Sequence, residues 1–302
     1  MQEIIIRAGC FVTIIFLGYV LRRIGVFKAD DFKVLSQIVL KITLPAAIIT
    51  SFAGKKIDIA MLSIALIGLG GGLLYMFLGY VMNRRKGNDW KAFGLLNLSG
   101  YNIGNFTMPF VQSFLGPMGV ITTSVYDVGN AFVCLGGAYG VSKSIKGDGH
   151  FSLVKILKTL TKSVAFDCYL IMIVMSLMNL QMPAPVVSLA KIIADANAFV
   201  AMLMLGVGFR ISGDKKQTAT IVKYLLVRYG TAAALAVGCF SLLPFPLEVR
   251  QALVILSFSP IASAAPAFTG EMDGDVGLSS AINSISIVCS IVIIVGILLF
   301  ML

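Results

Sequence analysis

Apolar runs of about 20 residues follow one another along almost the whole chain of 302 residues. Each run ends at charged or turn residues, and the connections between runs are short. An α-helix needs about 20 apolar residues to cross a bilayer, so the pattern predicts an all-α membrane protein with ten transmembrane helices. The predicted spans are Ile4–Val20, Val34–Phe52, Ile57–Val81, Trp90–Phe114, Val120–Val141, Val164–Leu180, Val186–Gly208, Thr220–Leu243, Ala252–Gly270 and Leu278–Leu302.

The composition agrees with a chain surrounded by lipid. Hydrophobic residues make up 58% of the sequence and charged residues 13%, and the mean hydropathy is +0.94. A soluble domain would be about 45–50% apolar and about a quarter charged. This excludes an ordinary cytosolic enzyme, a disordered protein and a nucleic-acid-binding module. The net charge of +10 does not indicate a nucleic-acid partner, because the basic residues fall in short clusters between the apolar runs.

The positions of the basic clusters predict the orientation, since cytoplasmic loops are enriched in Lys and Arg. The even-numbered loops hold only Lys55, Lys56 and Arg250. With ten spans, both termini are therefore expected outside the cell membrane. The first run has no basic n-region or cleavage site and is interpreted as a span rather than a signal peptide. The basic residues of loops one, three, five and seven are Arg22, Arg23, Lys28, Lys33, Arg84, Arg85, Lys86, Lys91, Lys143, Lys146, Lys155, Lys158, Lys162, Arg210, Lys215 and Lys216.

Metal-ligand spacing is absent from the sequence. The five cysteines lie far apart inside apolar runs, and the single histidine is His150. We therefore expect no metal and no other cofactor. The coupling ion stays open between H⁺ and Na⁺, because main-chain carbonyls of broken helices bind Na⁺ without a sequence motif.

The two halves of the chain share a weak internal repeat. A shift of 154 residues places span two on span seven, and a shift of 157 places Pro109 on Pro266. Because each half holds five spans, the second half must enter the membrane inverted relative to the first. Secondary transporters commonly have such repeats, with the substrate near the membrane midplane between them. We therefore expect five-helix repeats at 1–150 and 151–302.

Spans four and nine contain residues that a lipid-facing helix avoids. Asn102, Asn105 and Pro109 interrupt span four, and serines with Pro260 and Pro266 interrupt span nine. Proline removes a main-chain hydrogen bond, and main chain freed in a membrane needs protein or a water-lined cavity around it. Two ordinary proline kinks are one interpretation. The equivalent places in both halves favour two broken helices that cross, whose partly positive N-termini would seat a carboxylate.

These motifs resemble a known family. The run from Asn102 to Pro109, followed seven residues later by Gly116, is similar to the fourth-span motif of the auxin efflux carrier family. Leu44-Pro45-Ala46, the stretch 195–206 and the stretch 260–268 resemble its spans two, seven and nine. The resemblance implies ten spans in two inverted repeats, a fold similar to sodium/proton antiporters and bile-acid transporters, and homodimers. It also implies transport of small organic anions such as auxin, malate or malonate.

The resemblance also implies roles for individual residues. Asn102 matches the asparagine that contacts the substrate carboxylate, and Pro109 matches the crossover proline. Spans one, two, six and seven would form the scaffold and dimer contact, while the other six spans move. Ile103 and Thr107 stand where the family usually has Thr and Gly, and Pro266 lies about one residue from the position of the plant carriers' second proline. These departures affect the expected identity of the substrate more than the expected fold. The other residues expected to shape the pocket are Tyr101, Asn105, Pro260, Ser263 and Pro266.

Several charged residues lie inside apolar runs, where a charge at the bilayer centre costs about 2.5–3.5 kcal/mol on insertion scales. The 154-residue shift relates Lys41 to Asp195, so pseudo-twofold symmetry would bring this base and acid together. Asp195 has Lys191 four residues before it as an alternative partner. We hypothesise that protonation of Asp195 or Asp127 is coupled to substrate movement, with Lys41 favouring the charged carboxylate. The candidates expected to reach an interface or a neighbouring helix are Asp167 and Arg228.

Other classes of protein fit the sequence less well. An intramembrane aspartyl protease needs two apposed aspartates, which Asp127 and Asp275 only superficially suggest, because Asp275 lies in an acidic loop. Neither GxSxG nor HExxH is present. A channel or a transporter-like sensor for small anions would share the polar crossing. We therefore predict a non-enzymatic carrier that moves small organic anions by alternating access.

Overall fold

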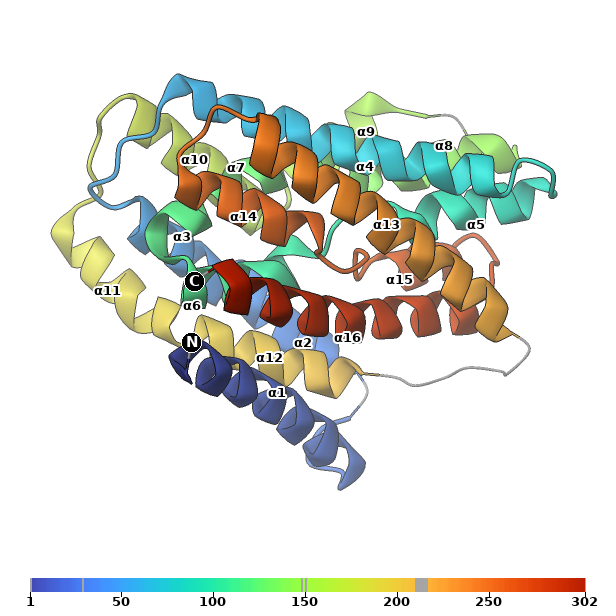
Figure 1. Cartoon of the computed structure of the whole chain (residues 1–302), viewed down its shortest axis with the longest axis horizontal. Helices are drawn as coiled ribbons and strands as arrows, with labels where there is room; N and C mark the ends of the chain where they lie inside the picture. Colours follow the sequence, from blue (N-terminus) through green and yellow to red (C-terminus); the bar gives the residue numbers. More distant parts are fainter. Residues whose placement is uncertain (1, 29, 148, 150, 210–216, 302) are drawn as a thin grey trace.

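The computed structural model of the chain describes residues 2–28, 30–147, 149, 151–209 and 217–301, and every regular element in these ranges is a helix (Figure 1). His150 and the seventh-loop residues Arg210, Lys215 and Lys216 lie outside the described residues. The elements of the first half are α1 (Gln2–Arg23), α2 (Asp31–Ile38), η1 (Val39–Thr43), α3 (Leu44–Phe52), η2 (Ile59–Leu62), α4 (Ser63–Met82), α5 (Asn88–Leu98), η3 (Ile103–Thr107), α6 (Met108–Phe114), α7 (Gly116–Phe132), η4 (Val133–Gly137) and α8 (Ala138–Lys146). Those of the second half are α9 (Leu153–Leu160), α10 (Val164–Leu177), α11 (Ala184–Asp195), α12 (Asn197–Gly208), α13 (Thr218–Leu242), α14 (Leu247–Ser257), α15 (Ala265–Gly270) and α16 (Val276–Met301).

Seven of the described helical stretches are long and apolar enough to cross a membrane. An eighth arises if α9 and α10, which are bent by 81° relative to each other, count as one span. The fifth predicted loop is therefore partly helical, with Lys155 and Lys158 on α9. The seven stretches are Gln2–Arg23, Asp31–Phe52, Ile59–Met82, Gly116–Lys146, Ala184–Gly208, Thr218–Leu242 and Val276–Met301.

The fourth and ninth apolar runs are interrupted helices. The first stops at Leu98 and resumes at Ile103, and the second stops at Ser257 and resumes at Ala265. The first break lies at Gly100, whose φ of +71° favours glycine, and therefore several residues before Pro109. Pro266 is the second residue of α15, a position where the missing amide costs little. Pro109 is the second residue of α6, which continues directly from η3.

Close helix contacts depend on small residues, which let two helices approach each other. On α4, a Cβ atom at Gly68 would overlap the carbonyl oxygen of Tyr126 on α7. A Cβ atom at Gly129 of α7 would overlap the carbonyl oxygen of Ala65 on α4. These two helices therefore approach to main-chain contact.

The chain ends lie at one end of the bundle. Figure 1 shows the N- and C-termini close together, with the connections after α1 and α4 at the opposite end. Arg84 and Arg85 of the third predicted loop follow the end of α4 and are exposed. The termini thus lie away from these two basic connections.

Candidate functional site

The two interrupted helices meet at their breaks. The main-chain amide of Asn102 donates a hydrogen bond of 2.9 Å to the main-chain oxygen of Pro260. Both residues are buried in the middle of the bundle. The breaks are therefore bound directly to each other, as expected for crossing broken helices. Two side-chain hydrogen bonds add to the contact, Thr107 Oγ1 to Ser259 Oγ at 2.7 Å and Asn105 Nδ2 to Ser263 Oγ at 3.3 Å.

An asparagine from the following helix binds the main chain of each break. Asn130 of α7 binds both polar main-chain groups of Tyr101. Its Nδ2 atom donates to the oxygen of Tyr101, and its Oδ1 atom accepts from the amide of Tyr101, both at 3.0 Å. Asn283 of α16 donates from Nδ2 to the oxygens of Ile261 and Ala262 at 3.0 and 3.2 Å. Amide side chains thus satisfy main-chain groups that the breaks remove from helices, as a membrane interior requires.

Arg228 is the basic residue of the crossing. Its side chain is completely buried on α13, and its guanidinium lies 4.0 Å from the ring centroid of Tyr75 and 4.6 Å from that of Tyr101. No described acid forms an ion pair with it. The guanidinium donates to main-chain oxygens at both breaks instead. Nη1 donates to the oxygen of Leu98 at 2.9 Å, and Nη2 donates to those of Ser259 at 2.9 Å and Pro260 at 3.4 Å.

This arrangement gives the crossing a defined polarity. Leu98 is the last residue of α5, and Ser259 and Pro260 follow just after the end of α14, so Arg228 lies at two helix C-termini, which carry partial negative charge. Its charge therefore offsets both helix ends. The helices that resume after the breaks begin on the other side, with partial positive charge at their amides.

Two cavities adjoin the resuming helices and share Asn102, Asn105 and Ser263 in their walls. The smaller has a volume of about 260 Å³, slightly below the range of about 300–1,000 Å³ that is typical of ligand pockets. The larger, of about 400 Å³, extends to Asp30 and Lys33 near the start of α2. A small metabolite fits this volume and has a route towards the end of the bundle with the basic loops.

Asn102 places an unpaired donor in the wall that the two cavities share. Its side chain is 4% exposed, and its Nδ2 atom donates no hydrogen bond within the described part of the protein. An unpaired buried amide costs free energy unless a ligand or water accepts from it. Asn105 and Ser263, in contrast, already bind each other.

The remaining predicted pocket residues support the site in other ways. The ring of Tyr101 packs edge-on against Tyr75 and Tyr126, and its hydroxyl lies against Gly71. It therefore packs against α4 and α7 rather than presenting a face for stacking. Pro260 contributes its carbonyl oxygen to the crossing.

The ionisable candidates divide into two groups. Asp127 lines the smaller cavity and accepts from Asn130 and Tyr169. Lys41 and Asp195 have exposed side chains and form no ion pair with each other, and Asp195 forms none with Lys191. The expected meeting of Lys41 and Asp195 is absent from the structure.

The protease-like pairing is also absent. Asp275 is exposed, accepts from the amide of Leu278 and from Gln217, and lies at the start of α16. Asp127 binds Asn130 and Tyr169 in the cavity instead. The two aspartates therefore form no dyad.

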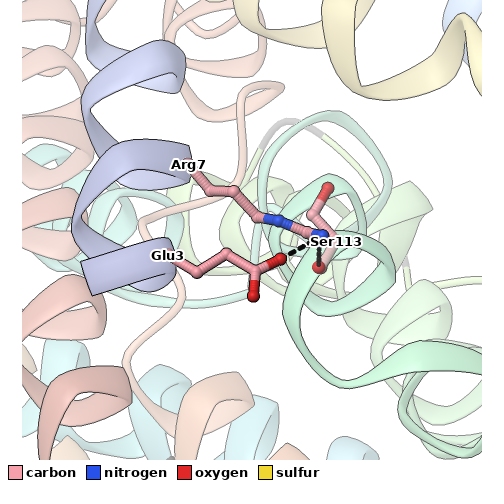
Figure 2. Close-up of polar contacts among 3 residues, drawn as sticks. All are labelled: Glu3, Arg7 and Ser113. Carbon is pink, nitrogen blue, oxygen red and sulfur yellow. Dashed lines mark hydrogen bonds and ion pairs between the residues drawn. The ribbon is translucent and has the colours of Figure 1, made fainter. Parts of the chain in front are cut away.

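At the end of the bundle with the termini, side chains of α1 contact α6. Arg7 Nη1 donates a hydrogen bond of 2.7 Å to the carbonyl oxygen of Ser113, and Arg7 Nη2 forms an ion pair of 2.8 Å with Oε1 of Glu3 (Figure 2). Beside this contact, the ring of Phe11 packs edge-on against Phe110 and Phe114. These contacts join α1 to α6 on this side, while the larger cavity extends to Asp30 and Lys33.

Sequence reasoning alone misses the roles of Arg228, Asn130 and Asn283. It expects Arg228 to reach an interface or a neighbouring helix, and Arg228 does bind the oxygen of Leu98 on α5. What it misses is that Arg228 is the largest fully buried side chain among those described and binds both breaks. The sequence does contain a signal for these roles, because polar and charged residues inside apolar runs rarely face lipid. Asn130, Asn283 and Arg228 are such residues.

A helical bundle with two interrupted, crossing helices and a polar cavity at their breaks is typical of membrane transport proteins. The sequence profile of the membrane transport protein family, which includes the auxin efflux carriers, matches residues 10–298. The chain therefore belongs to this family, and the resemblance inferred from the fourth span is confirmed. A protein from Methanothermobacter thermautotrophicus described as an uncharacterized transporter is 25% identical over 290 residues, covering 93% of this chain and 92% of the relative. Transport rather than catalysis is the activity that family membership implies.

Proposed function

We propose that the protein is a carrier of small organic anions whose carboxylate binds at the crossing of the two interrupted helices. The unpartnered Nδ2 atom of Asn102, in the wall of a polar cavity beside the starts of η3 and α15, is the observation on which the proposal depends. An acceptor carrying negative charge satisfies this donor and the adjacent helix amides together.

The electrostatics of the crossing support an anion. Arg228 offsets the partial negative charge of the helix C-termini, so that the positive charge of the N-terminal amides is left for the substrate. A cationic substrate would meet these amides with unfavourable charge. Asn105 and Ser263 would shape the pocket around the anion.

The architecture we propose is ten spans in two inverted five-helix repeats, counting the two interrupted helices and α10 as spans. Two observations support the repeat. Thr43 Oγ1 donates a hydrogen bond of 2.8 Å to Asn197 Oδ1. These two residues are 154 positions apart, which is the shift that relates spans two and seven. Asn130 donates to a main-chain oxygen of the first break, and Asn283 donates to main-chain oxygens of the second.

We propose that the carrier works by alternating access. The contact of Arg7 with Ser113 joins α1 and α6 on the side of the termini, and the larger cavity extends towards Asp30 and Lys33. We infer that this conformation opens to the cytoplasm of the cell, with both termini outside. We further infer a homodimer formed by the scaffold helices, as the family resemblance implies.

Thermal stabilisation of the purified protein by malonate, malate and indole-3-acetate tests the substrate class. At least one acid should raise the unfolding temperature, and its uncharged amide should not. In proteoliposomes the same acid should show saturable counterflow. Failure of all three acids to bind contradicts the proposal, and uptake without stimulation by acid on the other side indicates a channel.

A further inference from the structure

Asp127 is the one charged side chain among the described residues that line the smaller cavity. It projects from α7 and is half-buried. Asn102 and Ser263 line the same cavity, so a carboxylate bound at Asn102 shares this space with the side chain of Asp127.

Neutral donors alone bind Asp127. Asn130 donates from Nδ2 to Oδ1 at 2.8 Å, and Tyr169 of α10 donates to Oδ2 at 3.0 Å. None of the described ion pairs includes Asp127. No described cation therefore offsets its charge when an anion enters.

The other ionisable groups around α7 do not supply such a cation. Cys134 of η4 bonds to Asn130 Oδ1, and Tyr101 turns its ring towards Tyr75 and Arg228. Arg228 donates to the carbonyl oxygens of the breaks. Of the basic groups on the packed helices, both lysines of α9 are exposed, and the arginine of α14 donates to the oxygen of Phe240. The charged side chains on the described elements packed against α7 are Lys155 and Lys158 of α9, Asp167 of α10, and Glu248 and Arg250 of α14.

Asp127 is also linked mechanically to the crossing. Asn130, which binds its carboxylate, binds the main chain of Tyr101 directly before Asn102. On the other side, Tyr169 connects it to α10, a helix of the expected scaffold. A change of charge at Asp127 therefore acts on the substrate-binding break and on the contact between the two parts of the bundle.

We propose that Asp127 is the proton-coupling residue, which holds a proton whenever an anion occupies the cavity. Two negative charges in a small cavity of low dielectric constant repel each other strongly, and protonation of one removes the repulsion. On loading, a proton from solution bonds to the Asp127 carboxylate as the anion binds, and on release both leave. The proposal rests on the proposed anion site and makes transport a one-to-one symport of anion and proton. It assigns the role to Asp127 rather than to Asp195, because Asp195 is exposed and lines neither cavity.

The first arm of the test needs no substrate. Infrared difference spectra between acidic and alkaline pH, recorded for the wild type and for Asp127→Asn, should show a protonated-carboxyl band that the variant lacks. Absence of this difference overturns the proposal even if no tested acid binds, so that failure of the anion site is distinguished from failure of the coupling.

The second arm measures the affinity of malate, malonate and indole-3-acetate across pH values at which the acids themselves stay ionised. Uptake of one proton per anion predicts that wild-type affinity falls up to tenfold per pH unit as pH rises. Asp127→Asn, which keeps the shape of the side chain, should bind with affinity independent of pH. Asp195→Asn should retain the wild-type slope. A flat wild-type profile, an unchanged slope in Asp127→Asn, or loss of the slope in Asp195→Asn instead contradicts the proposal.

Discussion

The main-chain amide of Asn102 lies 2.9 Å from the main-chain oxygen of Pro260, so the two interrupted helices are hydrogen-bonded to each other at their breaks. The two residues are 158 positions apart and belong to different halves of the chain. Any movement of one break therefore acts on the other. The crossing behaves as one unit, with Arg228 bound to its carbonyl side.

Replacement of Arg228 should destabilise this unit. Arg228→Met leaves the oxygens of Leu98 and Ser259 without the donor that Arg228 supplies, while the oxygen of Pro260 keeps the amide of Asn102. Hydrogen bonds to charged groups contribute about 1.5–3 kcal/mol each. We expect a large fall in unfolding temperature, measured by scanning fluorimetry, and loss of anion binding in the fraction that folds. Arg228→Lys should recover part of both. Arg84→Met, which removes an exposed arginine, should leave both unchanged. Equal stability of Arg228→Met and the wild type would disprove this role.

The packing of α4 offers a matched pair of glycines. Gly68→Ala forces a methyl group onto the carbonyl of Tyr126, and overpacking costs typically about 1–3 kcal/mol. A methyl group at Gly70 would meet no atom within 4 Å, so Gly70→Ala should be neutral or slightly stabilising. Thermal unfolding of the two variants in the same detergent measures the difference. Similar unfolding temperatures would show that α4 and α7 are not in the tight contact described.

The contact of Arg7 with Ser113 should hold the terminal end of the bundle closed. Arg7→Ala removes the hydrogen bond between α1 and α6 and should increase labelling of a cysteine at Phe114 by a membrane-impermeant maleimide. Glu3→Gln removes only an exposed ion pair, which contributes about 0–1 kcal/mol, and should change labelling much less. The comparison is made in a background lacking the five native cysteines. Unchanged labelling in Arg7→Ala would mean that this contact does not control access.

The sequence predicts much of this architecture, because apolar length and misplaced polar residues are local signals. Asn102, Asn105 and Pro266 are unfavourable in a lipid-facing helix, and they lie at or beside the breaks. The position of the first break is less predictable. Main-chain geometry at Gly100 sets it, and Pro109 follows a π-helical turn that accommodates its ring.

Side-chain direction limits what the internal symmetry can predict. The shift of 154 residues is the separation of Thr43 and Asn197, which meet through their side chains. Lys41 and Asp195 lie two residues earlier in the chain, about half a helical turn away, and occupy exposed positions. Equivalent positions in a repeat thus meet only where both face the axis, which the sequence does not specify.

The central claim is that the Nδ2 atom of Asn102 binds the substrate carboxylate. It is tested most directly by isothermal titration of wild type, Asn102→Ala and Asn88→Ala with whichever of malonate, malate and indole-3-acetate stabilises the wild type most. Because Nδ2 has no partner among the described residues, Asn102→Ala should keep the wild-type unfolding temperature and lose roughly 10- to 100-fold in affinity. Asn88→Ala, at the exposed start of α5, should bind as the wild type does. Wild-type affinity in Asn102→Ala would contradict the claim.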